Sequence, residues 1–246
     1  MKSLNDKKSV RPSEPIGMDG ENNEDRSGVV GNERLTALAG AVLLVLILVE
    51  LVSSASLHAL LPIHIFTGIL LAGPLVVKLS STFYRFLRYY TRSPAFVRRG
   101  PPRLPLRVLG PPLLIMTLVV VGSGIGLVMT GPAQAGLLLP LHNISVLFWL
   151  SLIAIHVCAY LWRTPRLVAD DWRKPSGRSL VPGRGLRLGV NLGAGLSGAV
   201  AAILLFPGAA PWVVWSQTGQ TISAPLIVGL VIAILVLLIT RPFRWR

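Results

Sequence analysis

Two of the four histidines in this chain follow the same short pattern. Each ends a Leu-Pro-x-His sequence, which runs from Leu61 to His64 in one case and from Leu139 to His142 in the other. Proline is favoured in the first turn of a helix, so we expect each histidine about 5 Å inside the start of a helix. Two neutral imidazoles at one depth on neighbouring helices can bind one metal ion, for example as the two axial ligands of a haem iron.

A third histidine, His156, lies fourteen residues after His142 on the same predicted helix. At about 100° per residue, this spacing ends about 40° short of four full turns, so both rings share one helix face and lie about 21 Å apart. That separation suits two haems stacked across a membrane, one in each leaflet. Gly68 lies one turn after His64 on the same face and leaves room there for a flat porphyrin.

Four further residues are candidates for secondary roles. Glu50 is the only acid in an apolar segment: it is a hydrogen-bond acceptor for a histidine ring, a proton carrier beside a quinone, or simply a carboxyl kept within the bundle. Lys78 either pairs with a haem propionate or extends to the membrane surface. Met116 is expected near the depth of His156, where it would complete a second haem site. His58 is expected at the membrane interface and is a reserve ligand.

The composition requires membrane-spanning helices to position these residues. Of the 246 residues, 52% are hydrophobic and only 14% are charged, which is too apolar for a water-soluble protein. Residues 1–34 are rich in charged and polar side chains without an apolar run, so they predict a disordered cytoplasmic tail. Six apolar segments follow, each close to the roughly 20 residues that cross a bilayer. They cover residues 35–57, 61–80, 107–130, 139–162, 187–207 and 222–240.

The basic residues predict how these helices are oriented. After residue 34 there are 18 lysines and arginines, and all of them fall in residues 78–107, 163–187 and 241–246. The connections 58–60, 131–138 and 208–221 contain none. The positive-inside rule therefore places both termini and the basic loops in the cytoplasm, in a multi-pass protein of the plasma (inner) membrane. The net charge of +14 thus predicts contact with membrane lipid and no binding of nucleic acid.

Other chemistries have little support in the sequence. Cys158 is the only cysteine, which excludes an intramolecular disulfide and a cysteine-based metal cluster. There is no HExxH motif, no Ser-His-Asp set and no glycine-rich nucleotide motif after a strand. In the fifth segment small residues recur at four-residue spacing, which is typical of closely packed membrane helices. They are Gly189, Gly193, Ser197 and Ala201.

Residues 35–165 resemble the bacterial haem-b membrane cytochromes, the cytochrome b561-like group that includes b-subunits of hydrogenases and similar reductases. The resemblance rests on His64 near the outer start of the second helix and on the pair His142 and His156 on the fourth. It implies that His64 and His142 hold an outer haem b and that His156 is one ligand of an inner haem. Two-haem members supply the other inner ligand from another helix, whereas this chain has no histidine at that depth in its first three segments. One haem b is therefore expected, and two would require a partner such as Met116.

The sequence thus predicts an all-α integral membrane protein of six transmembrane helices, the first four forming a haem-binding bundle over residues 35–165. A basic cytoplasmic loop at 166–186 and two additional helices with a short basic C-terminus at 187–246 would complete it. The implied function is electron transfer between the quinone pool and a partner oxidoreductase subunit, with the redox chemistry supplied by the cofactor. The alternative is a haem-free membrane scaffold or assembly subunit, or a small transporter, which leaves the repeated Leu-Pro-x-His pattern to coincidence.

Overall fold

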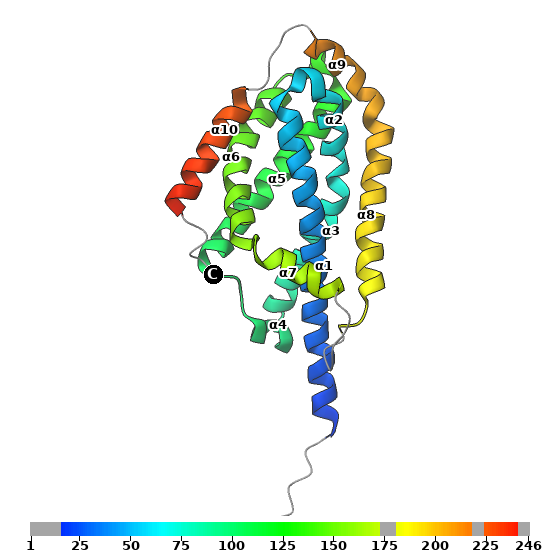
Figure 1. Cartoon of the computed structure of the whole chain (residues 1–246), viewed down its shortest axis with the longest axis vertical. Helices are drawn as coiled ribbons and strands as arrows, with labels where there is room; N and C mark the ends of the chain where they lie inside the picture. Colours follow the sequence, from blue (N-terminus) through cyan, green and yellow to red (C-terminus); the bar gives the residue numbers. More distant parts are fainter. Residues whose placement is uncertain (1–15, 173–180, 218–223, 241–246) are drawn as a thin grey trace, which may run out of the picture.

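All regular structure in the computed structural model is helical within the residues that it describes, which are 16–172, 181–217 and 224–240 (Figure 1). The helices are α1 (Ile16–Ala55), α2 (Leu57–Leu70), α3 (Ala72–Tyr90), α4 (Pro94–Arg99), α5 (Leu104–Thr130), α6 (Leu138–Tyr160), α7 (Arg163–Trp172), α8 (Arg184–Leu205), α9 (Ala210–Ser216) and α10 (Ala224–Thr240). Short 3-10 turns occupy Pro132–Gln134 and Phe206–Ala209.

Five helical stretches of the described residues are long and apolar enough to cross a membrane, as expected for a helical membrane protein. They are Ser27–Ala55, Leu57–Tyr90 across α2 and α3, Leu104–Thr130, Leu138–Tyr160, and Arg184–Ser216 from α8 to α9. The sixth predicted segment is helical as α10, but its apolar part, Leu226–Thr240, is shorter. At about 1.5 Å per residue it covers about 22 Å of a hydrocarbon core of about 30 Å, so a sixth span stays a prediction.

The start of α1 corrects the prediction of a disordered tail over residues 1–34. The helix begins at Ile16, while residues 1–15 lie outside the described part of the chain. Contacts with the rest of the molecule hold the later part of this segment: the Asn32 side chain donates to the carbonyl of Ser81 at 3.1 Å, and Glu33 is buried. The composition could not reveal this, because the same charged residues occur in solvated tails and in helices that pair their charges.

The helices form two groups that enclose a common interior. α1 packs against α2 and α3, and α8 packs against α2 and α3. α5 and α6 pair with each other, and α10 packs along α6. In Figure 1, α8 and α10 lie on opposite sides of the molecule, with α1, α2, α5 and α6 between them. The segments that carry the candidate histidines are therefore central, and the two C-terminal helices flank them.

α8 approaches the junction of α2 and α3 through glycine. A Cβ atom at Gly198 would overlap the carbonyl group of Leu70, and one at Gly73 would overlap the carbonyl group of Ala194. Two helix backbones can approach this closely only where a side chain is missing. The packed stripe of α8 therefore includes Ala194 and Gly198, and it continues to the buried Ala202.

This stripe differs from the one that the sequence predicted at Gly189, Gly193, Ser197 and Ala201. A Cβ atom at Gly189 or Gly193 would meet no atom within 4 Å. Small residues line two neighbouring stripes of α8, and spacing alone does not show which of them faces another helix. The buried polar residues Arg187 and Asn191 lie on the stripe that the structure uses.

Pro62 lies inside α2 and not in its first turn, because the helix starts earlier than predicted, at Leu57. Proline has no N–H, so the carbonyl of His58, four residues before it, lacks its helical hydrogen bond. The side chain of Gln217 donates to that carbonyl at 3.2 Å instead. The second proline of the pattern, Pro140, does lie in the first turn of its helix.

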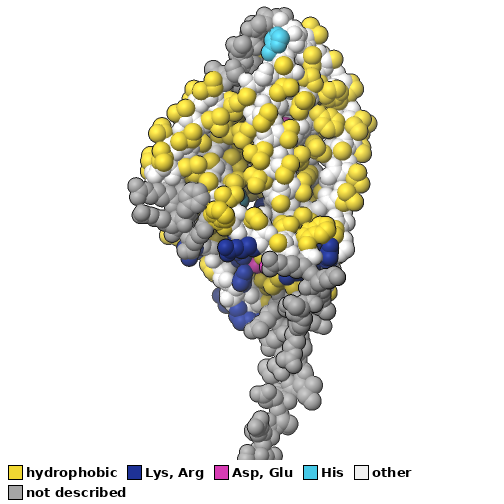
Figure 2. All heavy atoms as spheres, in the orientation of Figure 1, with side chains coloured by type: hydrophobic (Ala, Val, Ile, Leu, Met, Phe, Trp, Pro, Cys, Tyr) yellow, Lys and Arg dark blue, Asp and Glu magenta, His cyan; other side chains and the backbone are white. Residues whose placement is uncertain are grey.

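Lysine and arginine side chains gather below the hydrophobic surface on the face shown in Figure 2. We call this region the basic end; its placement in the cytoplasm stays a prediction of the positive-inside rule. The acid Glu33 of α1, buried at this end, pairs with three arginines from different segments. They are Arg85 at 3.4 Å, Arg99 at 2.9 Å and Arg163 at 3.1 Å.

A second acid at the basic end, Asp171 of α7, connects two membrane-spanning stretches. It pairs with Arg34 of α1 at 3.1 Å and with the buried Arg187 of α8 at 2.5 Å. Burial acts to raise the pKa of the Asp171 carboxyl, but the hydrogen bonds and charges of the two arginines outweigh it, so this pKa lies below its usual value. The ionised carboxylate therefore stabilises the folded protein.

We expect Gly198→Ala to destabilise the packing of α8 on the junction of α2 and α3. The added methyl group would overlap the Leu70 carbonyl, and overpacking of this kind costs about 1–3 kcal/mol. Thermal unfolding in detergent measures the loss. The matched control is Gly195→Ala on the same helix, where a Cβ atom meets nothing within 4 Å. Equal losses in the two variants would contradict the close contact.

Asp171→Asn should lower the thermal stability near neutral pH, because Arg187 would stay buried without its ionic partner. Removing one partner of a buried ion pair costs on the order of 3 kcal/mol. The pKa of Asp171 is lower in the folded protein than its usual 3.8, so its contribution is complete above that pH and disappears as the pH falls through the folded-state pKa. The difference in Tm between wild type and variant should therefore narrow on acidification.

The control for this measurement is Asp170→Asn, which removes the same charge from the exposed neighbouring acid. Its Tm should change less at neutral pH than that of Asp171→Asn. A difference in Tm that does not change with pH would show that the carboxylate of Asp171 does not hold α1 and α8 at the basic end.

Candidate functional site

A cavity lies among the first four apolar stretches of the chain. Residues of α1, α2, α5 and α6 form most of its wall, and α9 and α10 contribute Trp212 and Leu226. It contains about 1330 Å³ of atom-free space, including the part that opens to the outside. The wall is predominantly aliphatic. Its polar and ionisable side chains are Glu50, Ser54, His64, His142 and Asn143, together with Trp149 and Trp212.

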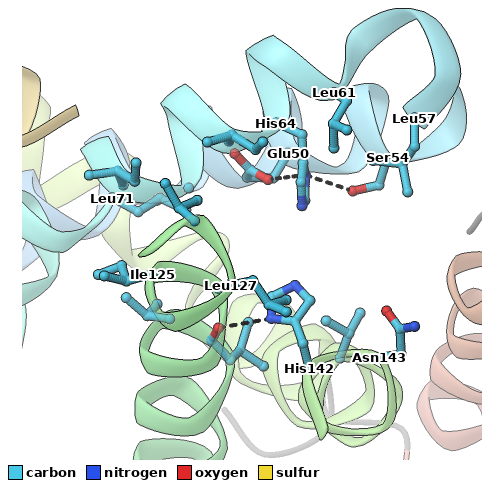
Figure 3. A pocket seen from close by; sticks show the side chains of 18 of the residues that line it. Glu50, Ser54, Leu57, Leu61, His64, Leu71, Ile125, Leu127, His142 and Asn143 are labelled. Atoms are coloured by element: carbon cyan, nitrogen blue, oxygen red, sulfur yellow. Dashed lines mark hydrogen bonds and ion pairs between the residues drawn. The ribbon is translucent and has the colours of Figure 1, made fainter. Parts of the chain in front are cut away.

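His64 of α2 and His142 of α6 point toward one another across this cavity (Figure 3). Their ring centroids are 6.5 Å apart, and the ring planes are inclined by 75°. The predicted pair of histidines is thus brought together by two helices that belong to different halves of the bundle. Because bonds from a metal ion to imidazole nitrogen are about 2 Å long, this separation leaves room for one ion bound to both rings.

Hydrogen bonds orient the ring of His64 through its Nδ1 atom. The carboxylate of Glu50 places Oε2 at 2.5 Å from this nitrogen, and the hydroxyl of Ser54 lies at 3.2 Å (Figure 3). Glu50 and Ser54 are one turn apart on α1, so both reach the same ring. With Nδ1 donating to the Glu50 carboxyl group, Nε2 of the neutral ring keeps its lone pair.

The ring of His142 is held in the same tautomer by different groups. Its Nδ1 lies 3.1 Å from the carbonyl oxygen of Val120 and 3.1 Å from the hydroxyl oxygen of Ser123. A carbonyl only accepts, so Nδ1 again carries the hydrogen. The hydroxyl of Ser123 donates to the carbonyl of Val119 and is free to accept from the ring. Among the described residues, all hydrogen bonds of both rings are made by Nδ1, which leaves both Nε2 lone pairs available.

Two glycines bring helix backbones close to these groups. A Cβ atom at Gly124 of α5 would lie 3.2 Å from Cε1 of His142, tighter than an ordinary contact, so this glycine lets the ring lie against α5. Gly68 lines the cavity, one turn after His64. A Cβ atom there would lie 3.8 Å from Oε1 of Glu50, which is an ordinary contact distance. Glycine at this position therefore enlarges the cavity, although a larger residue would not clash with Glu50.

The arrangement fits the iron of a haem. Within the described residues, no group of three or more His, Cys, Asp and Glu side chains is placed to hold a metal ion. A haem iron needs only two protein ligands, because the porphyrin supplies the others. The cavity offers two opposed imidazoles with available Nε2 atoms, and an aliphatic wall that suits a porphyrin.

The structure leaves four candidate residues outside this cavity. His156 has its ring 5.0 Å from that of Tyr160 and does not line the cavity. Met116 is half-buried on α5 and does not line it either. Lys78 donates to the carbonyl of Thr36 at 3.1 Å, which joins α3 to α1. His58 is exposed at the start of α2.

Several residues at the site were not identified from the sequence. The carbonyl of Val120 could not be, because a backbone acceptor has no side-chain signature. Ser54 lies one turn from Glu50, a spacing visible in the sequence, and Ser123 stands between two glycines. Trp212 lines the cavity and donates from Nε1 to the carbonyl of Leu127 at 2.7 Å, although its position in a connection predicted nothing about the site.

In comparisons with known proteins, no protein-family model, no curated protein and no solved structure matches this chain.

Proposed function

We propose that this protein is a b-type cytochrome that carries electrons within the membrane through one haem held by His64 and His142. The observation that carries the proposal is the pair of opposed rings, 6.5 Å apart between centroids, each with Nδ1 hydrogen-bonded and Nε2 available. Hydrogen bonds of this kind at Nδ1 are typical of histidines that bind a metal through Nε2. A scaffold or transporter requires no such pair.

The bound haem supplies the one-electron change of valence, and the chain supplies the surroundings. His64 and His142 would hold the haem, and their hydrogen bonds keep either ring from turning away. Leucine, isoleucine and valine of the four central helices would exclude water from it. Because neutral imidazole is required at both positions, the Nδ1 acceptors also favour the tautomer that binds metal.

The electron partners that we propose are the quinone pool and an oxidoreductase subunit. The apolar cavity supports a lipid-soluble partner, because it opens to the outside and lies among helices long enough to span a membrane. The basic end is the surface that we propose for a soluble or membrane-bound redox subunit, on the cytoplasmic side of the plasma membrane. One haem is proposed, because His156 lies outside the cavity that holds the other two histidines.

Purified protein supplied with haem should give a b-type signal in a reduced-minus-oxidised absorption spectrum. His64→Ala or His142→Ala should reduce bound haem by at least about tenfold, because each removes one of the two imidazoles that would hold it. His58→Ala and His156→Ala are matched controls, since both remove an imidazole outside the cavity and should keep the signal. The haem-to-protein ratio should be close to one.

Three results would contradict this proposal in different ways. If the wild-type protein gives no b-type signal, it is not a cytochrome. If the signal survives in both His64→Ala and His142→Ala, these residues are not the ligands. If the haem-to-protein ratio is near two and His156→Ala lowers it, the protein has an inner haem site, and Met116 becomes the first partner to test.

A further inference from the structure

We infer that Glu50 sets the redox potential of the proposed haem site, by placing an uncompensated negative charge against one ligand so that the oxidised state is favoured. This inference rests on the proposed function, because it assumes that His64 binds iron. It concerns a residue that the function itself does not require, since the iron needs only the two imidazoles.

Among the described residues, Glu50 is the one formally charged side chain in the wall of the cavity. No lysine or arginine of this part of the chain lines the wall, and the buried amine of α3, Lys78, bonds the Thr36 carbonyl instead. The Glu50 side chain is 14% exposed, and its second oxygen, Oε1, is buried with no hydrogen-bond partner among the described groups. A carboxylate in this position has lost most of its hydration without gaining a cation.

The Glu50 carboxylate would stabilise a ferric haem more than a ferrous one, because the ferric state carries one more positive charge. Glu50 would act on a bound haem through His64, since its Oε2 accepts from Nδ1 while Nε2 faces the cavity. A carboxylate that accepts from the far side of an imidazole makes the ring a stronger donor to the metal. Both effects stabilise the oxidised state more than the reduced state and lower the midpoint potential.

The opposite ligand provides a comparison within the same site. His142 donates to the neutral carbonyl of Val120 at 3.1 Å, and no charged group touches its ring in the described structure. The two ligands therefore differ mainly in the charge behind Nδ1. The site thus has an anionic side formed by α1 and α2 and a neutral side formed by α5 and α6.

The test is a potentiometric titration of the full-length haem-loaded protein at one pH, comparing wild type with Glu50→Gln. Glutamine keeps the size and an acceptor oxygen but removes the charge. We expect the equilibrium to shift toward the reduced haem by at least about tenfold, which is a rise of about 59 mV for one electron. Ser54→Ala, which removes a neutral neighbour of the same nitrogen, should shift it less. Glu50→Asp, which keeps the charge but moves it farther from the ring, should raise the potential above wild type by less than Glu50→Gln.

Each outcome decides between the inference and the proposed function. If Glu50→Gln binds haem but shifts the potential no more than Ser54→Ala, the inference fails while the cytochrome stands. If wild type binds no haem, the proposed function fails. If Glu50→Gln binds haem too weakly for titration, the ratio of its ferric to ferrous haem affinity is measured instead: a tenfold fall supports the inference, and an unchanged ratio overturns it. If this variant does not accumulate, Glu50→Asp decides, since its more distant charge must raise the potential above wild type.

Discussion

Hydrocarbon offers no partner for a hydrogen bond, and this constraint governs where each polar group of the chain lies. In the interior, the imidazoles of His64 and His142 satisfy their Nδ1 atoms on opposite walls of one cavity. The Nε2 atom of each ring, which keeps its lone pair, then faces the other ring. The geometry of the proposed metal site is therefore a consequence of how two buried rings complete their hydrogen bonding, with the apolar wall excluding the water that could otherwise compete.

The same constraint acts at the basic end, where acids and arginines from distant segments meet. Glu33 and Asp171 each accept from more than one arginine, and their partners come from α1, α3, α8 and the segments around α4 and α7. These ion pairs fix the relative heights of the helices at one end of the bundle, while close glycine contacts fix α8 further along. Helix heights in turn determine whether two histidines on different helices meet.

The periodic and compositional features of the sequence were sufficient to predict the helices and the meeting of His64 with His142, because hydropathy and a repeated proline pattern depend on local chemistry. A hydrogen bond from a histidine ring was one of several roles that the sequence left open for Glu50. The position of Glu50 along its helix indicated its depth in the membrane, but not which neighbouring helix its side chain faces. The packed stripe of α8, the helical start of α1 and the Val120 carbonyl could not be predicted. Each depends on which of several equivalent faces or acceptors another helix of the chain presents, and the residue pattern of a single helix does not contain that information.

The glycine contact between α8 and the Leu70 carbonyl has a mechanical consequence. α2 and α3 continue through Leu71 as one helical stretch, because the backbone of Leu71 is helical and its N–H donates to the carbonyl of Thr67 at 2.9 Å. α8 packs against this stretch from outside the cavity, a short distance along the chain from His64. The tilt of the segment bearing His64 therefore depends on a helix that contributes no chemistry of its own.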